Sequence, residues 1–307
     1  MSAKVLYISD EEYFARPSID QSQLKQFMRN PAEWAWARLH PEEHKATDAM
    51  RFGTAFHAYL LGTKEVVSLD EGEDFRKAEN REWRDEQIES GKLVVSHEEM
   101  QRLERMYANI ARYPEYMSLI ENGTAEVAIE WADKETGLTL KAKPDLIPQG
   151  TDFLVDLKTA SSAAPGDFMR ESYKYGYHIQ AQFYRQAVAM CSPGEFGRGS
   201  RIPDAMQFWV FEKTGACDWS PYSLSSDNPM MHTAGQAIRQ ALRGIALYVR
   251  RGEEAGLGEG LDAAARWALG TAETPNHGYG KVPSEIEYSD WALLDAERSL
   301  TILASAA

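Results

Sequence analysis

The sequence is poor in cysteine and contains no long apolar run. Its 307 residues include two cysteines, Cys191 and Cys217. Two are too few for a four-cysteine zinc site or an iron–sulfur cluster, and we expect both to be free thiols. No stretch approaches the roughly 18 apolar residues of a membrane span. The N-terminus, MSAKVLYISDEEYF, has neither the basic nor the apolar segment of a signal peptide. We therefore expect a cytoplasmic protein with no membrane partner.

Basic residues are also scarce relative to acidic ones. Lys and Arg number 33 against 47 Asp and Glu, which gives a formal net charge of −14. A protein that coats nucleic acid non-specifically needs many contacts between Lys or Arg and phosphates. The composition argues against that class, so any contact with nucleic acid has to be local. Divalent cations held by carboxylates would reconcile an acidic chain with a phosphate substrate.

Apolar spacing, caps and turn signals predict a series of helices. A helix in two parts fits residues 18–39, with Asp20 as its cap and Pro31 starting the second part. Ser96 and Glu99 form a capping-box pattern at the start of another helix. Further helices are predicted at residues 49–61, 166–190, 229–251 and 284–303, with an exposed helix or excursion at 70–91 and a glycine-rich linker with one short helix after 251.

The middle of the chain changes to the pattern of strands. Three consecutive antiparallel strands are predicted at residues 125–131, 138–147 and 153–158, and two more at 206–213 and 217–224. We therefore predict an α/β (α+β) fold with a central mixed sheet of about five strands flanked by helices. Residues 1–225 would form the main domain, and residues 226–307 a helical extension that packs on it or serves oligomerisation.

Two acidic residues are expected to converge on the hairpin LTLKAKPDLIPQGTDFLVDLKTA. Side chains alternate between the two faces of a strand, so Asp156 and Lys158 share one face. If the turn centres between Gly150 and Thr151, Asp145 lies opposite Asp156 with Cα atoms about 5 Å apart. The hairpin thus predicts two neighbouring carboxylates with a lysine beside them.

Paired carboxylates with a lysine suit metal-assisted phosphate chemistry. Two close carboxylates raise each other's pKa, and a divalent cation removes that conflict. Magnesium prefers oxygen ligands, typically one or two carboxylates with water and substrate phosphate. The backbone carbonyl of Leu157 lies between Asp156 and Lys158 and could add a ligand. Lys158 could position or deprotonate the attacking water. By themselves these residues predict a metal-binding hairpin that fits several phosphate chemistries.

The spacing of Pro-Asp at 144–145 and Asp-Leu-Lys at 156–158 resembles the PD-(D/E)XK nuclease superfamily, which has a restriction-endonuclease-like core. GTAFH at 53–57 is similar to the G-x-x-x-H helix of its RecB-type branch, where the histidine helps to hold a metal; here it is His57. Gln180 and Tyr184 match that branch's Q-x-x-x-Y helix, which lies beside the site and contacts DNA.

Within that branch, residues 5–215 most resemble the exonuclease VIII (RecE) C-terminal nuclease domain and its phage relatives. The resemblance implies a Mg²⁺ cofactor, for which Mn²⁺ could substitute, and binding to double-stranded DNA ends. It implies digestion of one strand of linear duplex from its 5′ end, leaving a 3′ single strand for a RecT-like single-strand annealing protein. It also implies a homo-oligomeric ring. Two cysteines exclude the iron–sulfur subfamilies of this branch.

Each candidate residue also has an ordinary structural interpretation. His57 could be a core histidine, Asp145 a turn carboxylate, Lys158 a solvated strand end, and Gln180 and Tyr184 an exposed hydrogen-bonded pair. A weaker candidate near the metals is Glu126, although either Glu126 or Glu130 could be a solvated edge residue. Others are Lys141, Lys143, Arg170 and Lys174 along the DNA backbone, and Ser22, Lys25 or Arg29 at a 5′ phosphate.

Two other functions remain open from the sequence. One is a structure-specific endonuclease on the same fold, and the other is a non-catalytic module that binds DNA ends. The juxtaposed carboxylates speak against the second, because a pure binder has no reason to place them near a phosphate.

Overall fold

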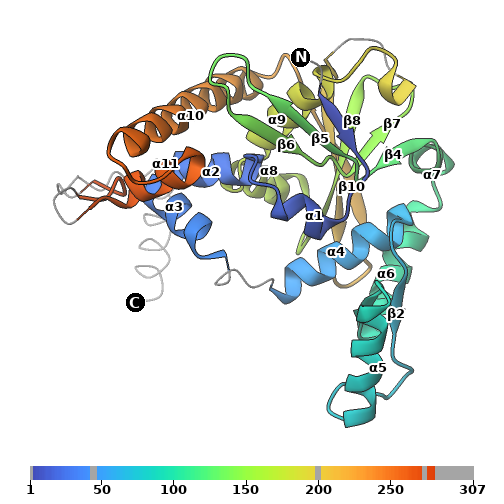
Figure 1. Ribbon diagram of the computed structural model, residues 1–307. Helices are drawn as coiled ribbons and strands as arrows, with labels where there is room; N and C mark the ends of the chain where they lie inside the picture. Colours follow the sequence, from blue (N-terminus) through green and yellow to red (C-terminus); the bar gives the residue numbers. More distant parts are fainter. Residues whose placement is uncertain (1–2, 42–46, 198–201, 272–274, 281–307) are drawn as a thin grey trace, which may run out of the picture. The chain divides into compact units, whose positions relative to one another are not determined.

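A computed structural model describes residues 3–41, 47–197, 202–271 and 275–280. The chain divides into two compact units, Met1–His277 and Gly278–Ala307. The first is a mixed α/β unit (Figure 1), as predicted. The helix expected at residues 284–303 lies outside the described ranges. Within those ranges, no helix combines the length and apolarity needed to cross a membrane, and both cysteines are free thiols, as expected.

The centre of the first unit is a five-stranded mixed sheet, as predicted. Its strand order is β10-β9-β8-β7-β4, with β8 and β9 parallel and the other pairs antiparallel. The strands are β4 (Gly123–Ala125), β7 (Leu146–Pro148), β8 (Phe153–Ala160), β9 (Ala205–Glu212) and β10 (Trp219–Ser225). Residues Leu154 to Leu157 of β8 are all buried, because helices cover both faces of this strand.

Two smaller sheets complete the strand structure. A three-stranded sheet has the order β1-β5-β6, and a parallel pair joins β2 to β3. Their bounds are β1 (Lys4–Leu6), β5 (Ala128–Ala132), β6 (Thr139–Ala142), β2 (Val66–Ser68) and β3 (Leu93–Val95). The three-stranded sheet, called the small sheet below, lies beside the central one (Figure 1).

The continuous strands predicted at residues 125–131 and 138–147 were wrong, because each is broken and passes from one sheet to the other. Glu126 has a left-handed backbone with φ of 47°, which a regular strand does not permit. Pro144 lacks the N–H that a central strand would need. The pairs Ala125–Leu146 and Ile129–Ala142 nevertheless share one antiparallel register, so the two chain segments stay aligned through the break.

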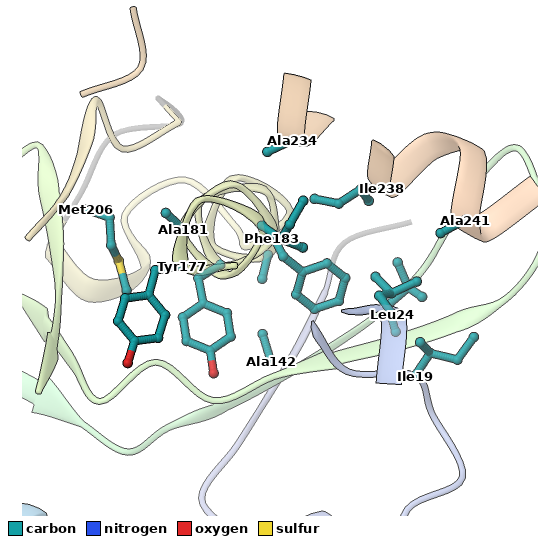
Figure 2. Close-up of a cluster of buried hydrophobic side chains, with 14 of the residues drawn as sticks. Ile19, Leu24, Ala142, Tyr177, Ala181, Phe183, Met206, Ala234, Ile238 and Ala241 are labelled. Carbon is teal, nitrogen blue, oxygen red and sulfur yellow. The ribbon is translucent and has the colours of Figure 1, made fainter. Parts of the chain in front are cut away.

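One face of the central sheet is covered by helices from both ends of the first unit. They are α2 (Gln21–Arg29), α3 (Pro31–Leu39), α8 (Pro165–Lys174), α9 (Tyr177–Ala189), α10 (Pro229–Glu254) and α11 (Gly260–Leu269). In Figure 2, Phe183 of α9 lies between Ala142 of the small sheet, Leu24 of α2 and Ile238 of α10. Helices α10 and α11 therefore belong to the same compact unit as the sheet.

The other face packs against a second apolar cluster. Phe56 of α4, Leu103 of α6 and Phe211 of β9 lie in its centre. The helices on this side are α4 (Asp48–Leu61), α6 (His97–Ile110) and α7 (Pro114–Glu121), while α5 (Ala78–Glu89) has no buried residue. Helix α1 (Asp10–Ala15) and the short 3-10 turn Glu195–Gly197 complete the described elements.

The predicted helix ends are largely confirmed. The Asp20 carboxylate accepts from the Gln23 N–H at 2.9 Å, and Ser96 and Glu99 form the expected capping box. The single helix expected at residues 166–190 was wrong, because Gly176 adopts φ of 64° and separates α8 from α9. A glycine is the residue that takes this left-handed conformation without strain.

Lys141 has a structural role and does not face a DNA backbone as expected. It is 2% exposed, and its Nζ donates to the carbonyl oxygens of Tyr13 and Arg16 at 2.8 Å each. Contacts with the end of α1 bury the Lys141 side chain on β6. Lys141 thus fastens the end of α1 to the small sheet.

Lys141→Met is therefore expected to destabilise the fold. The methionine keeps most of the aliphatic volume but removes the ammonium group, so the carbonyl groups of Tyr13 and Arg16 each lose one donor. We expect a loss of about 1–3 kcal/mol in the free energy of unfolding, measured by urea denaturation. An unchanged unfolding midpoint would contradict this role. The matched control is Lys174→Met, because Lys174 is exposed.

Candidate active site

A row of three acidic residues crosses three adjacent chain segments. The register Leu146–Val155 makes Asp145 and Asp156 the next opposing pair, as the hairpin pattern predicts. The shared register of the neighbouring segments places Glu126 opposite Asp145 on its other side, and the Glu126 N–H donates to the Asp145 carbonyl at 2.9 Å. Glu126 and Asp145 line one cavity, and the charges of Asp156 and Glu126 both act on Asp145, so the three carboxylates lie near one another.

Asp145 has a strongly raised pKa in this row. Burial raises the pKa of Asp145 well above its usual range, and the charge of Asp156 raises it further. One oxygen, Oδ2, accepts from the Leu157 N–H at 2.7 Å, which fixes the carboxylate against β8. A buried carboxylate next to another carboxylate is the arrangement that a divalent cation relieves.

Asp156 is held from two sides. It is 1% exposed, its Oδ1 accepts from Gln180 Nε2 at 2.5 Å, and its Oδ2 forms an ion pair with Lys158 Nζ. Lys158 Nζ also donates to Gln180 Oε1 at 3.4 Å and lies 4.6 Å from the ring centre of Tyr177. Both ends of the Gln180 amide therefore face the site, and Gln180 positions the carboxylate and the lysine relative to each other.

His57 approaches the row from α4. Its Nδ1 lies 3.6 Å from Asp145 Oδ2, and a backbone hydrogen bond links it with Leu157. Desolvation lowers the pKa of His57, which favours the neutral imidazole, the form that binds metals. Gly53 lies one turn earlier on α4, where an added Cβ would be 3.4 Å from Thr159 Oγ1, so a small residue lets α4 approach β8 closely.

A cavity of about 240 Å³ opens onto this row. Six of the residues predicted from the sequence line it: Ser22, His57, Glu126, Lys143, Asp145 and Tyr184. Asp156, Lys158 and Gln180 are not among its lining residues, although the charges of Asp156 and Lys158 both act on Asp145. Tyr184 is 7% exposed, and burial raises its pKa well above the usual range.

Several of the weaker candidates do not line the cavity, among them Arg170, which pairs with Asp167 on α8. Arg29 pairs with Glu33 on the exposed surface of α2 and α3, and Glu130 pairs with Arg16 at 2.8 Å. Sequence reasoning missed Asp10, which lines the cavity and pairs with Lys143 and Lys64. The capping box of Ser9 and Glu12 could have indicated α1, which places Asp10.

The donor set fits a hard divalent cation. Asp156 Oδ2 is buried and receives no hydrogen bond of good geometry, although it lies against Lys158. Carboxylate oxygens and a backbone carbonyl are the ligands that Mg²⁺ prefers. Among the described residues, no group of three or more His, Cys, Asp or Glu side chains is arranged as a complete metal site. The residues that would hold the ion are Asp145, Asp156, His57 and the carbonyl of Leu157.

The comparisons with known proteins agree with this geometry. Residues 20–255 match the family described as PDDEXK-like domain of unknown function (DUF3799), and the chain belongs to that family. A search of curated proteins gives no significant match.

Several solved structures match the chain. A protein from Eubacterium rectale, titled "Putative exonuclease", has a TM-score of 0.53 at 18% identity, over 81% of this chain and 88% of its own. A phage-related exonuclease from Haemophilus somnus has a TM-score of 0.31 at 12% identity, over 76% of this chain and 95% of its own. An alkaline exonuclease from Laribacter hongkongensis has a TM-score of 0.28 at 17% identity, over 67% and 99%. The first of these shows the shared fold.

Proposed function

We propose that this protein is a Mg²⁺-dependent exodeoxyribonuclease that degrades one strand of linear double-stranded DNA from its 5′ end. The observation that carries the proposal is the acidic row of Glu126, Asp145 and Asp156, with Lys158 held against Asp156 by Gln180, beside a cavity. Membership of the PDDEXK-like family and the fold shared with a protein titled as an exonuclease support it.

The roles of the residues follow from their contacts. A bound divalent cation would supply an activated water and screen the phosphate charge. Lys158 is held by Asp156 and Gln180, so its ammonium group is in place to orient the attacking water and to neutralise charge on the phosphate. Asp145 is fixed by the Leu157 N–H, and His57 stays neutral beside it. Tyr184 and Lys143 border the space where the scissile phosphate would lie.

The biological setting is part of the same proposal. A 5′-to-3′ exonuclease leaves 3′ single strands, which a RecT-like annealing protein would receive for recombination. We propose a cytoplasmic location and a homo-oligomeric ring around the product strand. Sedimentation with and without DNA would test the ring.

The proposed activity makes a direct prediction about substrate and metal. Linear duplex labelled at the 5′ end should release short labelled products in Mg²⁺, while duplex labelled at the 3′ end should keep its label on a long single strand. Excess EDTA should abolish both reactions, because the carboxylate row cannot bind a phosphate without a cation. Mn²⁺ should restore cleavage. Cleavage that persists in EDTA would overturn the proposed metal dependence.

Covalently closed circular DNA separates the alternatives. An exonuclease leaves it intact, whereas a structure-specific endonuclease nicks it. A non-catalytic end-binding module would shift labelled linear duplex in a gel but leave it uncut in both metals.

A further inference from the structure

An exposed aromatic and basic segment lies at the turn between α8 and α9. Tyr173, Lys174 and Tyr175 are three consecutive exposed residues. The two tyrosines are 74% and 49% exposed, although large aromatic side chains usually bury most of their surface. We call residues 173–175 the YKY turn. Gly176, with its left-handed backbone, ends α8 and turns the chain into α9.

The rings of the YKY turn are already ordered by the protein. Tyr175 stacks on Tyr177 with centroids 6.1 Å apart and planes 25° apart. Tyr177 is itself buried and stacks on Phe208 of β9. Tyr173 lies nearly parallel to His178, with centroids 6.4 Å apart. Rings that are held in place lose little conformational entropy when a ligand stacks on them.

Two lysines lie beside these rings in an otherwise acidic protein, and the Tyr177 hydroxyl donates to Glu171 at 3.5 Å. Lys174 Nζ lies 5.1 Å from the ring centre of Tyr175, and Lys25 Nζ donates to the Tyr175 carbonyl at 3.1 Å. Within the described ranges, neither lysine forms an ion pair with a carboxylate. Burial, and then the charge of Lys158, lowers the pKa of Lys25 to about 8, so Lys25 carries its positive charge mainly below that pH.

The aromatic stack leads directly to the catalytic lysine. Lys158 Nζ lies over the ring of Tyr177, and Tyr177 stacks with Tyr175. The side chain of Lys25 packs over Gly176, where an added Cβ would meet Lys25 Cδ at 3.0 Å. The YKY turn is therefore continuous with the site at Lys158.

We propose that the YKY turn and Lys25 bind the unpaired DNA strand next to the scissile phosphate. Bases would stack on Tyr175 and Tyr173, and the backbone phosphates would lie against Lys174 and Lys25. Stacked aromatics in a basic track are the usual means of binding single strands without sequence preference. A duplex hides its base faces, so this surface selects unpaired nucleotides. The inference rests on the proposed nuclease function, because it places a DNA strand at Lys158.

Binding of a single-stranded oligonucleotide with one 2-aminopurine tests the proposal. The measurement uses full-length Asp156→Asn protein in Mg²⁺, so that the strand survives. Stacking should quench the fluorescence of 2-aminopurine on binding. Adding Tyr175→Ala should weaken binding by about 5- to 150-fold and remove the quenching, whereas Tyr175→Phe should retain both because it keeps the ring. The matched control is Tyr113→Ala, which is 47% exposed and packs on Trp219 across the sheet.

A second variant acts through charge alone. Lys174→Gln should reduce the slope of log affinity against log salt by about 0.7, the value for one lost phosphate contact on a single strand. Equal affinity and equal quenching in the Tyr175→Ala and Tyr173→Ala proteins would overturn the proposal. If the wild-type protein cuts no DNA but these variants lose binding, the nuclease function fails and the strand site stands. If it cuts DNA and the variants bind normally, only the strand site fails.

Discussion

Asp156→Asn should remove DNA cleavage while leaving the protein folded. Asparagine has nearly the same shape and can still accept the hydrogen bond from Gln180. It cannot form the ion pair with Lys158 or bind a cation through a charged oxygen. Misplacing the lysine alone should cost about 10²- to 10⁴-fold in rate. Loss of one buried charge beside Asp145 relieves repulsion, so we expect a thermal midpoint equal to or above that of the wild type.

Rates of release from labelled linear duplex and a thermal melt would measure the two effects together. The control is Asp48→Asn, the same chemical change on α4 at a side chain that is 90% exposed. It should leave the rate within about two-fold, because surface substitutions of this kind usually shift stability by less than about 0.5 kcal/mol. A variant at Asp156 that cuts DNA at the wild-type rate would exclude this carboxylate from the chemistry.

Phe183→Ala should cause a large loss in the free energy of unfolding. Phe183 is completely buried in α9, with its ring 5.1 Å from that of Trp131, and it joins the small sheet to α2 and α10 (Figure 2). Removing a buried phenyl ring and leaving a cavity costs about 3–5 kcal/mol. The free energy of unfolding of a typical domain is about 5–15 kcal/mol, so this loss would be a large part of it.

Urea unfolding followed by tryptophan fluorescence would show this as a lower midpoint at an unchanged slope. Phe14→Ala is the control, because Phe14 is 71% exposed on α1 and undergoes the same change of atoms. A midpoint shift no larger than that of the control would contradict the central position of Phe183 in the core.

Local rules predicted the hairpin at the site correctly. Asp156 and Lys158 share a face because alternation along one strand depends on neighbouring residues alone, and the opposition of Asp145 to Asp156 follows from the length of one turn. The N-terminal caps at Asp20 and Ser96 were predictable for the same reason: each depends on residues within three positions.

Features that depend on distant contacts were not predictable. Lysine side chains are usually exposed, but the end of α1 covers Lys141 and accepts both of its hydrogen bonds. The sequence places Gln180 beside the site by resemblance, but it does not show that the two ends of the Gln180 amide contact Asp156 and Lys158. Gly176 within an apolar helical pattern is compatible with a continuous helix or a break, and the packing of Lys25 and Tyr177 decides between them.

Because the break at Glu126 and Asp145 is aligned in the two segments, the position of the acidic row depends on the number of residues in each crossing between the sheets. The segments on either side of the break keep one register through both sheets. Inserting or deleting a single residue between Ala125 and Ala128, or between Ala142 and Leu146, would slip one segment and turn its side chains to the opposite face. The acidic row would then lose a member without any substitution of a carboxylate. Point changes in these crossings can be tolerated where the backbone permits, but changes in their length cannot.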